Sequence, residues 1–303
     1  MNIIIYHFIK HVFIYRSEHV GDIVTIGSSY LELRGITQDP ETKEYLIVMS
    51  YANRGDLKNQ LKYKIHEVLW GNKVEYLYDL SAQLYGIHET GTVHCNLHSG
   101  NILVSDVSFS MCDSERHLYI IGFRHSCPEN TTVSEVYGVL PYVAPEILRK
   151  QPYTTAADVY SFGVIMYELA SGKPPYPDRP HNTELALDIV QGLHPKFAEE
   201  TPQCYVDLAK RCLDVDPHKR PSAEELMEII SRWKSKYVDI DYYYDDDVYS
   251  NSEIYQQFSK ANELLFNAAR NPVTKLHPEA NCTSRVLNGI IEAVNLHLGK
   301  YYF

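Results

Sequence analysis

The stretch VHCNLHSGNILV, from Val93 to Val104, has apolar residues at both ends and polar residues in its centre. A helical pattern precedes it over residues 73–90, and strand-like pieces separated by polar loops follow as far as residue 146. Residues 155–171 are apolar on nearly every side, which predicts a helix buried at the centre of a domain. The polar loop between these elements is a candidate functional site.

The composition is that of an ordinary soluble globular protein. Of the 303 residues, 45% are apolar and 22% are charged, which is enough for one large domain or two modest ones. The net charge of -11 argues against nucleic acid or an anionic membrane as a partner. The apolar opening MNIIIYHFIKHVFIY is interrupted by His7 and Lys10 and is too short for a membrane span. We predict a buried strand there, in preference to a signal peptide.

The six cysteines form no C-x-x-C pair, so the sequence predicts reduced thiols, no zinc site and a cytoplasmic location. A metal pair made of Cys95 and His98 is the weaker alternative.

Five motifs occur in one order along the chain. They are LIVMSYANRGDL (46–57), VHCNLHSGNILV (93–104), GVLPYVAPEIL (138–148), DVYSFGVIMYELASGKPPY (158–176) and CLDVDPHKRPSAEEL (212–226). In this order and spacing, residues 35–234 resemble the protein-kinase domain, close to its tyrosine-kinase-like branch. The tail HPEANCTSRVLN (277–288) resembles a C-terminal extension found on expanded fungal members of that branch.

The resemblance implies a kinase-like α+β fold with a truncated or degenerate small lobe and a mainly helical large lobe. We expect a small-lobe remnant with the hinge at 1–52, the large lobe at 53–236, an acidic, tyrosine-rich linker at 237–252 and a helical extension at 253–303. Two apolar stripes in that extension predict a helical hairpin. The segment 30–33 is the expected hairpin partner of the strand 45–50. The glycine-rich phosphate loop and the lysine-bearing strand are missing before Gly35, where Lys10 is the one lysine.

The resemblance also assigns nucleotide-binding and structural roles. Met49 falls at the gatekeeper position, the hinge includes Tyr51 and Ala52, and Leu103 lies beneath the adenine; plain core packing is the alternative for Met49 and Leu103. The structural positions are Glu146 and Arg220, expected to form a buried bidentate ion pair, and Asp158, expected to accept backbone N–H bonds from the catalytic loop.

The catalytic positions depart from the family pattern. The loop H-R-D-L-x-x-x-N begins here at His94 and retains the magnesium-binding asparagine as Asn101, but Asn96 replaces the aspartate that acts as the base. Loss of a general base costs about 10²–10⁴ in rate. Gly122 replaces the magnesium-binding aspartate of the D-F-G motif, and magnesium prefers carboxylates. The sequence therefore predicts that ATP and Mg²⁺ binding is possible but weakened, and that neither is required.

Three hypotheses follow from this pattern. The first is a pseudokinase that acts on other proteins, such as active kinases or scaffolds, as a signalling scaffold or allosteric partner. The second is a weakly active ATP-dependent Ser/Thr or Tyr protein kinase. The third is a chain whose start omits the true small lobe, although a restored small lobe would leave Asn96 and Gly122 in place.

Overall fold

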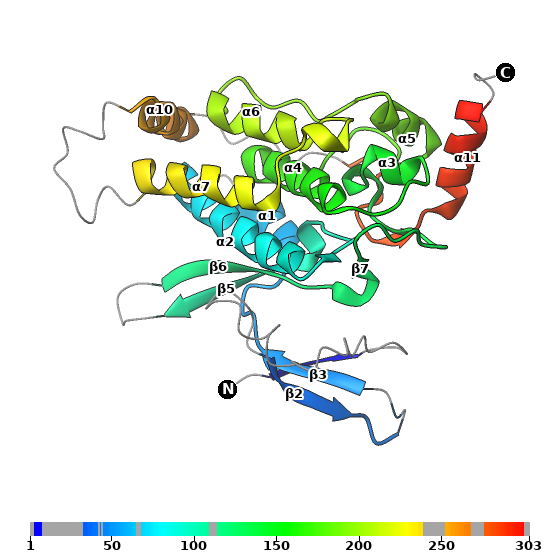
Figure 1. The fold of residues 1–303 in the computed structure, drawn as a ribbon. Coiled ribbons are helices and arrows are strands. Elements are labelled where there is room, and N and C mark those ends of the chain that lie inside the picture. The colour runs from blue at the N-terminus through cyan, green and yellow to red at the C-terminus, as the bar shows by residue number, and fades with distance from the viewer. Residues whose placement is uncertain are drawn as a thin grey trace.

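The structure is a computed structural model that describes residues 3–7, 33–41, 43, 45–64, 68–108, 114–238, 252–267 and 276–299. A small sheet near the N-terminus lies below a larger, mainly helical body (Figure 1). Lys10 and most of the expected acidic linker, residues 239–251, lie outside the described residues. No helix in the described ranges combines the length and apolar character needed to cross a membrane.

The small lobe contains a three-stranded antiparallel sheet in the order β1-β3-β2. Its strands are β1 (Ile3–His7), β2 (Leu33–Gln38) and β3 (Tyr45–Ser50). The predicted hairpin partner at 30–33 was wrong by several residues. Gln38 pairs with Tyr45 across the Asp39-Pro40 turn, so β2 must end next to that turn to keep this register. The expected N-terminal strand is present as β1, and it pairs with β3.

The large lobe is built around α4 (Thr155–Ser171), the helix that the apolar pattern predicted at its centre. Side chains on several of its faces, including Phe162, Val164 and Ile165, are fully buried. α7 (Ala223–Tyr237) begins after Ser222, whose hydroxyl accepts a hydrogen bond from the Glu225 N–H at 3.1 Å. The other helices of this lobe are α1 (Leu57–Lys64), α2 (Trp70–Glu89), α3 (Pro145–Leu148), α5 (Thr183–Val190) and α6 (Gln203–Cys212).

Short strands frame the loop quoted from the sequence. β4 (Thr92–Val93) enters the loop and pairs with β7 (Cys127–Pro128). β5 (Ile102–Ser108) leaves the loop after the short 3-10 helix η2 (Ser99–Asn101) and pairs with β6 (Ser114–Ile120). Among the described residues after β6, the chain also contains the 3-10 turns η3 (Phe123–His125), η4 (Leu140–Tyr142) and η5 (Pro217–Lys219) and the strand β8 (Tyr137–Gly138).

The two C-terminal helices do not form the predicted hairpin. α10 (Glu253–Asn267) lies against α7, α2 and α6, and α11 (Asn288–Gly299) lies against α5 and α3 at the opposite end of the lobe (Figure 1). Each apolar stripe is covered by the large lobe, as shown by the full burial of Phe258 in α10 and Val294 in α11. Before α11, the strand β9 (Arg285–Val286) pairs with β8.

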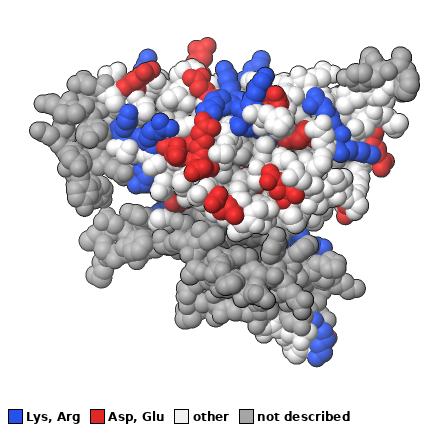
Figure 2. Space-filling view, in the orientation of Figure 1, with Lys and Arg blue, Asp and Glu red and all other residues white. Residues whose placement is uncertain are grey.

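Charged side chains of both signs are mixed over the helical body on the face shown in Figure 2. The excess of acidic residues therefore does not form one continuous acidic surface on this face.

Candidate functional site

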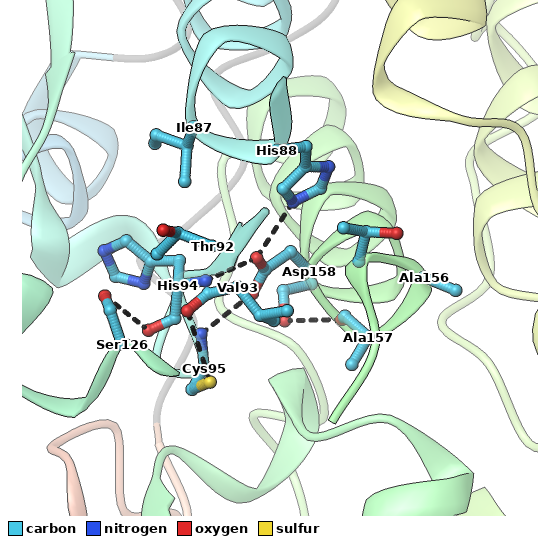
Figure 3. A network of polar contacts seen from close by, with 12 residues as sticks. Ile87, His88, Thr92, Val93, His94, Cys95, Ser126, Ala156, Ala157 and Asp158 are labelled. Atoms are coloured by element: carbon cyan, nitrogen blue, oxygen red, sulfur yellow. Dashed lines mark hydrogen bonds and ion pairs between the residues drawn. The ribbon is translucent and has the colours of Figure 1, made fainter. Parts of the chain in front are cut away.

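Asp158, near the start of α4, holds the first residues of the candidate catalytic loop in place. Its side chain is 1% exposed. Its two carboxylate oxygens accept hydrogen bonds from the backbone N–H groups of His94 at 2.7 Å and Cys95 at 3.0 Å (Figure 3). The Nε2 atom of His88 lies 3.0 Å from the same carboxylate. The geometry expected for this aspartate is therefore present, and it fixes the loop to the central helix.

His94 is fully buried and connects the loop to the segment that follows β6. Its Nε2 atom lies 2.8 Å from the carbonyl oxygen of Ile121, and its Nδ1 atom accepts a bond from the Asn96 N–H at 3.3 Å. These partners assign the proton of a neutral ring to Nε2. Burial lowers the pKa of His94, which also favours the neutral ring. The ring of Phe123 packs edge-on against it at 5.1 Å.

Asn101 occupies the space beside Gly122. Gly122 has a φ of 90°, in the left-handed region, and a Cβ atom built on it would lie 2.7 Å from the Cγ of Asn101. The Nδ2 of Asn101 donates to the carbonyl oxygen of Asn96 at 2.8 Å, and the Ile121 N–H donates to the Asn101 carbonyl at 2.9 Å. The retained asparagine is thus bonded to the backbone of the loop. A carboxylate side chain at position 122 would require it to move.

The side chains at this position do not fit a magnesium site. The predicted ligand is Asn101, a neutral amide, and Gly122 at the other metal-binding position supplies no side chain. Among the described residues no group of three or more His, Cys, Asp or Glu side chains is placed to hold a metal ion. The weaker alternative of a Cys95–His98 pair has no support either, because the Cys95 thiol contacts Cys127 at 3.1 Å, while His98 bonds Gly100 and Ser284. Magnesium prefers carboxylates together with phosphate oxygens.

The residues predicted to bind adenine are partly brought together. Ala52, Leu103 and Tyr119 form a small buried apolar cluster, separate from the main core, with Ile121 packed at its edge. Tyr51 in the hinge is 40% exposed. Of Met49 the structure describes the backbone, which pairs with residues of β1 and β2.

Glu146 and Arg220 form the bidentate pair that the sequence predicted. The Nη1 and Nη2 atoms of Arg220 each lie 2.7 Å from one carboxylate oxygen of Glu146. The arginine also donates to the carbonyl oxygens of Asp214 and Ala156, both at 2.8 Å. Both side chains are almost fully buried, with 0% of Arg220 and 3% of Glu146 exposed. This pair connects α3 to the loop before α7 and belongs to the frame of the lobe.

Sequence reasoning missed that the C-terminal segment reaches the catalytic loop. The Oγ atom of Ser284 lies 3.3 Å from the Oδ1 of Asn96 and 2.7 Å from the Nε2 of His98. Ser284 and Asn96 are 188 residues apart in the sequence, so no local pattern connects them. The one available signal was the motif HPEANCTSRVLN, which indicated an extension without giving its position.

A buried acid near the loop was also missed. Glu168 in α4 is 3% exposed, and its Oε2 atom has no hydrogen-bond partner among the described residues. Burial raises the pKa of Glu168 to about 7. Its sequence context, an acidic residue inside the apolar pattern of 155–171, was the available signal.

Comparison with known proteins agrees with this framework of contacts. The family model described as the protein kinase domain matches residues 14–230, which is more than half of the chain. The chain belongs to the protein kinase family. The kinase domain is 31% identical over 184 residues to a putative serine/threonine-protein kinase/receptor R831 of Acanthamoeba polyphaga mimivirus, a match that covers 60% of this chain and 11% of the relative.

Two further relatives are also named as protein kinases. The serine/threonine-protein kinase fray1 of Dictyostelium discoideum is 29% identical over 231 residues, covering 73% of this chain and 37% of the relative. The mitogen-activated protein kinase kinase kinase dlk-1 of Caenorhabditis briggsae is 28% identical over 224 residues, covering 72% of this chain and 24% of the relative. The matched part of this kinase domain spans well under half the length of each of these relatives.

Proposed function

We propose that this kinase domain has lost phosphoryl transfer and works by binding other proteins, as a signalling scaffold or an allosteric partner of active kinases in the cytoplasm. The observation that carries the proposal is the arrangement of Asn96, Asn101 and Gly122. Neutral groups stand at the two positions where the family has carboxylates, and the retained asparagine is bonded into the loop. The tyrosine-kinase-like branch and its expanded fungal members remain our proposal for the subfamily.

The missing base supports this proposal through proton transfer. In the family the aspartate of this loop accepts the proton of the substrate hydroxyl. The Oδ1 of Asn96 can accept a hydrogen bond and so orient a hydroxyl, as it does with Ser284 at 3.3 Å. An amide oxygen does not take up the proton at any accessible pH. A step that needs this proton removed therefore loses about 10²–10⁴ in rate.

The missing metal ligand supports it through electrostatics. Phosphoryl transfer depends on positioning and on neutralising the charge that develops on the phosphate oxygens. With Gly122 at the D-F-G position and the amide of Asn101 donating to the Asn96 carbonyl, the site lacks the negative charge that would attract a dication. We expect metal-dependent nucleotide binding to be weakened more than adenine binding, because the cluster around Leu103 is intact.

The alternative is a weakly active ATP-dependent protein kinase. Family membership and the serine/threonine-kinase names of the relatives favour it, as does the retention of Asn101. Tyrosine specificity is compatible with the same framework. What separates the two functions is whether the nucleotide binds together with magnesium and whether a phosphoryl group then leaves it.

The experiment is a thermal melt of the chain with ATP, in magnesium and in EDTA. A ligand at 100 times its Kd stabilises by about 2.7 kcal/mol, which for a domain of this size is a shift of about 5–10 °C. We expect no magnesium-dependent shift. A shift in EDTA that disappears when Ala52→Trp fills the apolar cluster would mean that nucleotide is kept as a structural ligand.

A phosphotransfer assay completes the test. The chain and its Asn96→Asp variant should both transfer no phosphate above background, because the variant restores the base and leaves Gly122 unchanged. A magnesium-dependent melting shift together with transfer by the unaltered chain would overturn the proposal and establish the weak kinase.

A further inference from the structure

We propose that residues 281–288, called here the tail segment, are an internal peptide ligand. They occupy an extended peptide-binding groove across the catalytic loop, place the Ser284 hydroxyl where an acceptor hydroxyl would lie, and close this groove to other proteins. The ligand class is an extended peptide of the pattern Ser-Arg-Val-Leu-Asn, and the occupant is the chain itself. The inference rests on the proposed function in treating the groove as a surface for binding.

The hydroxyl of Ser284 is held by a defined chain of hydrogen bonds. The Gly100 N–H donates to the Nδ1 of His98 at 3.0 Å, so the proton of a neutral ring lies on Nε2. That Nε2 then donates to the Ser284 Oγ at 2.7 Å, and the hydroxyl donates to the Oδ1 of Asn96 at 3.3 Å. Burial lowers the pKa of His98 to about 3, which keeps the ring neutral as this chain requires. The serine is therefore oriented towards the position of the missing base.

The backbone of the tail segment binds as an added β-strand. β9 pairs antiparallel with β8, with Gly138 opposite Arg285 and Tyr137 opposite Val286. The Leu287 N–H continues the ladder by donating to the carbonyl oxygen of Val136 at 2.9 Å. Addition of an extended strand to a free edge is a general mode of peptide recognition, in which backbone bonds give affinity and alternate side chains give specificity.

The side chain of Asn288 makes two further hydrogen bonds at the C-terminal end of this strand. The Oδ1 of Asn288 accepts from the Val136 N–H at 2.9 Å, and its Nδ2 donates to the carbonyl oxygen of Ser134 at 2.9 Å. The two bonds imitate a further backbone pair. They connect the tail segment to the part of the chain between η3 and β8.

Two neighbouring side chains of the segment face opposite ways. Leu287 is 1% exposed, whereas its neighbour Val286 is 48% exposed. The burial of Leu287 continues into α11, where Ile291 is 3% exposed and Val294 is fully buried. Leu287 is therefore the buried apolar anchor of the segment, and Val286 beside it faces away from the groove.

The N-terminal half of the segment is held from both sides. The Nζ of Lys58 donates to the carbonyl oxygen of Cys282 at 2.8 Å. His181 is 2% exposed, and its Nδ1 lies 2.9 Å from the carbonyl oxygen of Asn281. Arg285 donates to the carbonyl oxygen of His181 at 2.7 Å. Most of these contacts are to the backbone of the segment, so a second peptide of the same pattern would satisfy them.

The test uses a labelled synthetic peptide of residues 276–299 and measures its binding to the full chain by fluorescence anisotropy. In the unlatched chain, Leu287→Ala and Asn288→Ala together remove the buried anchor and the two side-chain bonds. The matched control is Val286→Ala, which alters the same strand at its exposed position. We expect the peptide to bind the unlatched chain at least about tenfold more tightly than the wild-type or the control chain. A peptide carrying the Leu287→Ala and Asn288→Ala changes should lose this binding.

Two results would overturn the proposal. One is equal binding of the peptide to the unlatched, control and wild-type chains, and the other is no binding to an unlatched chain that still shows a cooperative melt. Asn288→Ala alone is the milder variant if the double change prevents folding, and it should give a smaller gain in the same direction. Because the assay contains no nucleotide, its failure leaves the loss of phosphoryl transfer untouched, and a magnesium-dependent ATP shift leaves the groove untouched.

Discussion

Replacing Gly122 by alanine should destabilise the chain by about 1–2.5 kcal/mol. The left-handed backbone, with φ of 90°, costs a residue with a Cβ about 1–2 kcal/mol. The new Cβ would lie 2.7 Å from the Asn101 Cγ, so that side chain must move and lose its bond to the Asn96 carbonyl, worth about 1 kcal/mol. The smaller entropy of the unfolded alanine chain offsets roughly 0.4–1 kcal/mol of this cost.

Urea unfolding followed by tryptophan fluorescence measures this loss. The two tryptophans, Trp70 and Trp233, are each 3% exposed and pack against Tyr205 and Phe258 in the large lobe, away from the substitution. Unfolding of the lobe should therefore change their emission, while the variant's native spectrum stays that of the wild type.

A matched control separates backbone strain from overlap. Gly55 also has a positive φ, of 75°, but a Cβ there would meet no atom within 4 Å. Gly55→Ala should therefore cost about 1 kcal/mol less than Gly122→Ala. Asn101→Ala should cost about 1 kcal/mol less in the Gly122→Ala chain than in the wild type, because the bond that it removes is already lost there. Equal costs at both glycines, or a cycle without coupling, would refute the view that Asn101 fills the carboxylate position.

Three further predictions concern buried charges. Arg220→Met should cost about 3–5 kcal/mol in urea unfolding because it leaves the carboxylate of Glu146 buried and unpaired, and adding Glu146→Leu should recover most of that loss. Burial raises the pKa of Glu168 from 4.5 to about 7, so its folded form binds more protons in that window; stability should fall by about 3 kcal/mol as the pH rises through it, and Glu168→Gln should flatten the curve. Burial lowers the pKa of Lys73 from 10.5 to about 8, so stability should rise between these pH values and be lost as the pH falls through 8. Lys73→Met should then melt higher at pH 7, and an unchanged or lower midpoint would contradict this.

The large lobe was predictable because its helices are long, periodic and capped. α4 has the bounds that its apolar pattern indicated, and α7 begins after Ser222, a residue type that favours the N-cap position. The bonds of Asp158 and the pair of Glu146 and Arg220 are different in kind. No periodicity implies them, and they were predicted because the motifs of a known family place those side chains together.

The sequence predicted that the C-terminal extension forms helices, but it did not predict where these helices pack. An apolar stripe shows that one face of a helix is covered, but two such stripes are covered equally well by each other or by separate surfaces. In the structure, Phe258 of α10 packs against the rings of Trp70 and Trp233. The helix α11, which carries Val294, packs against α5 and α3. The contact of Ser284 with Asn96 joins two polar residues. Hydrophobic patterns indicate buried apolar faces and therefore do not predict such a contact.

Because β9 pairs with β8, a partner peptide must compete with the tail segment for the groove. A segment tethered to its own binding site acts at a local concentration on the order of millimolar, whatever the concentration of the protein. A partner peptide with the same contacts, present at about micromolar concentration, would therefore occupy roughly one chain in a thousand. Access to this surface therefore depends on the concentration of the partner relative to the local concentration of the tail segment, which the tether sets. A successful partner must exceed the affinity of the tail segment by about that factor, or arrive when the segment has been drawn away by another contact.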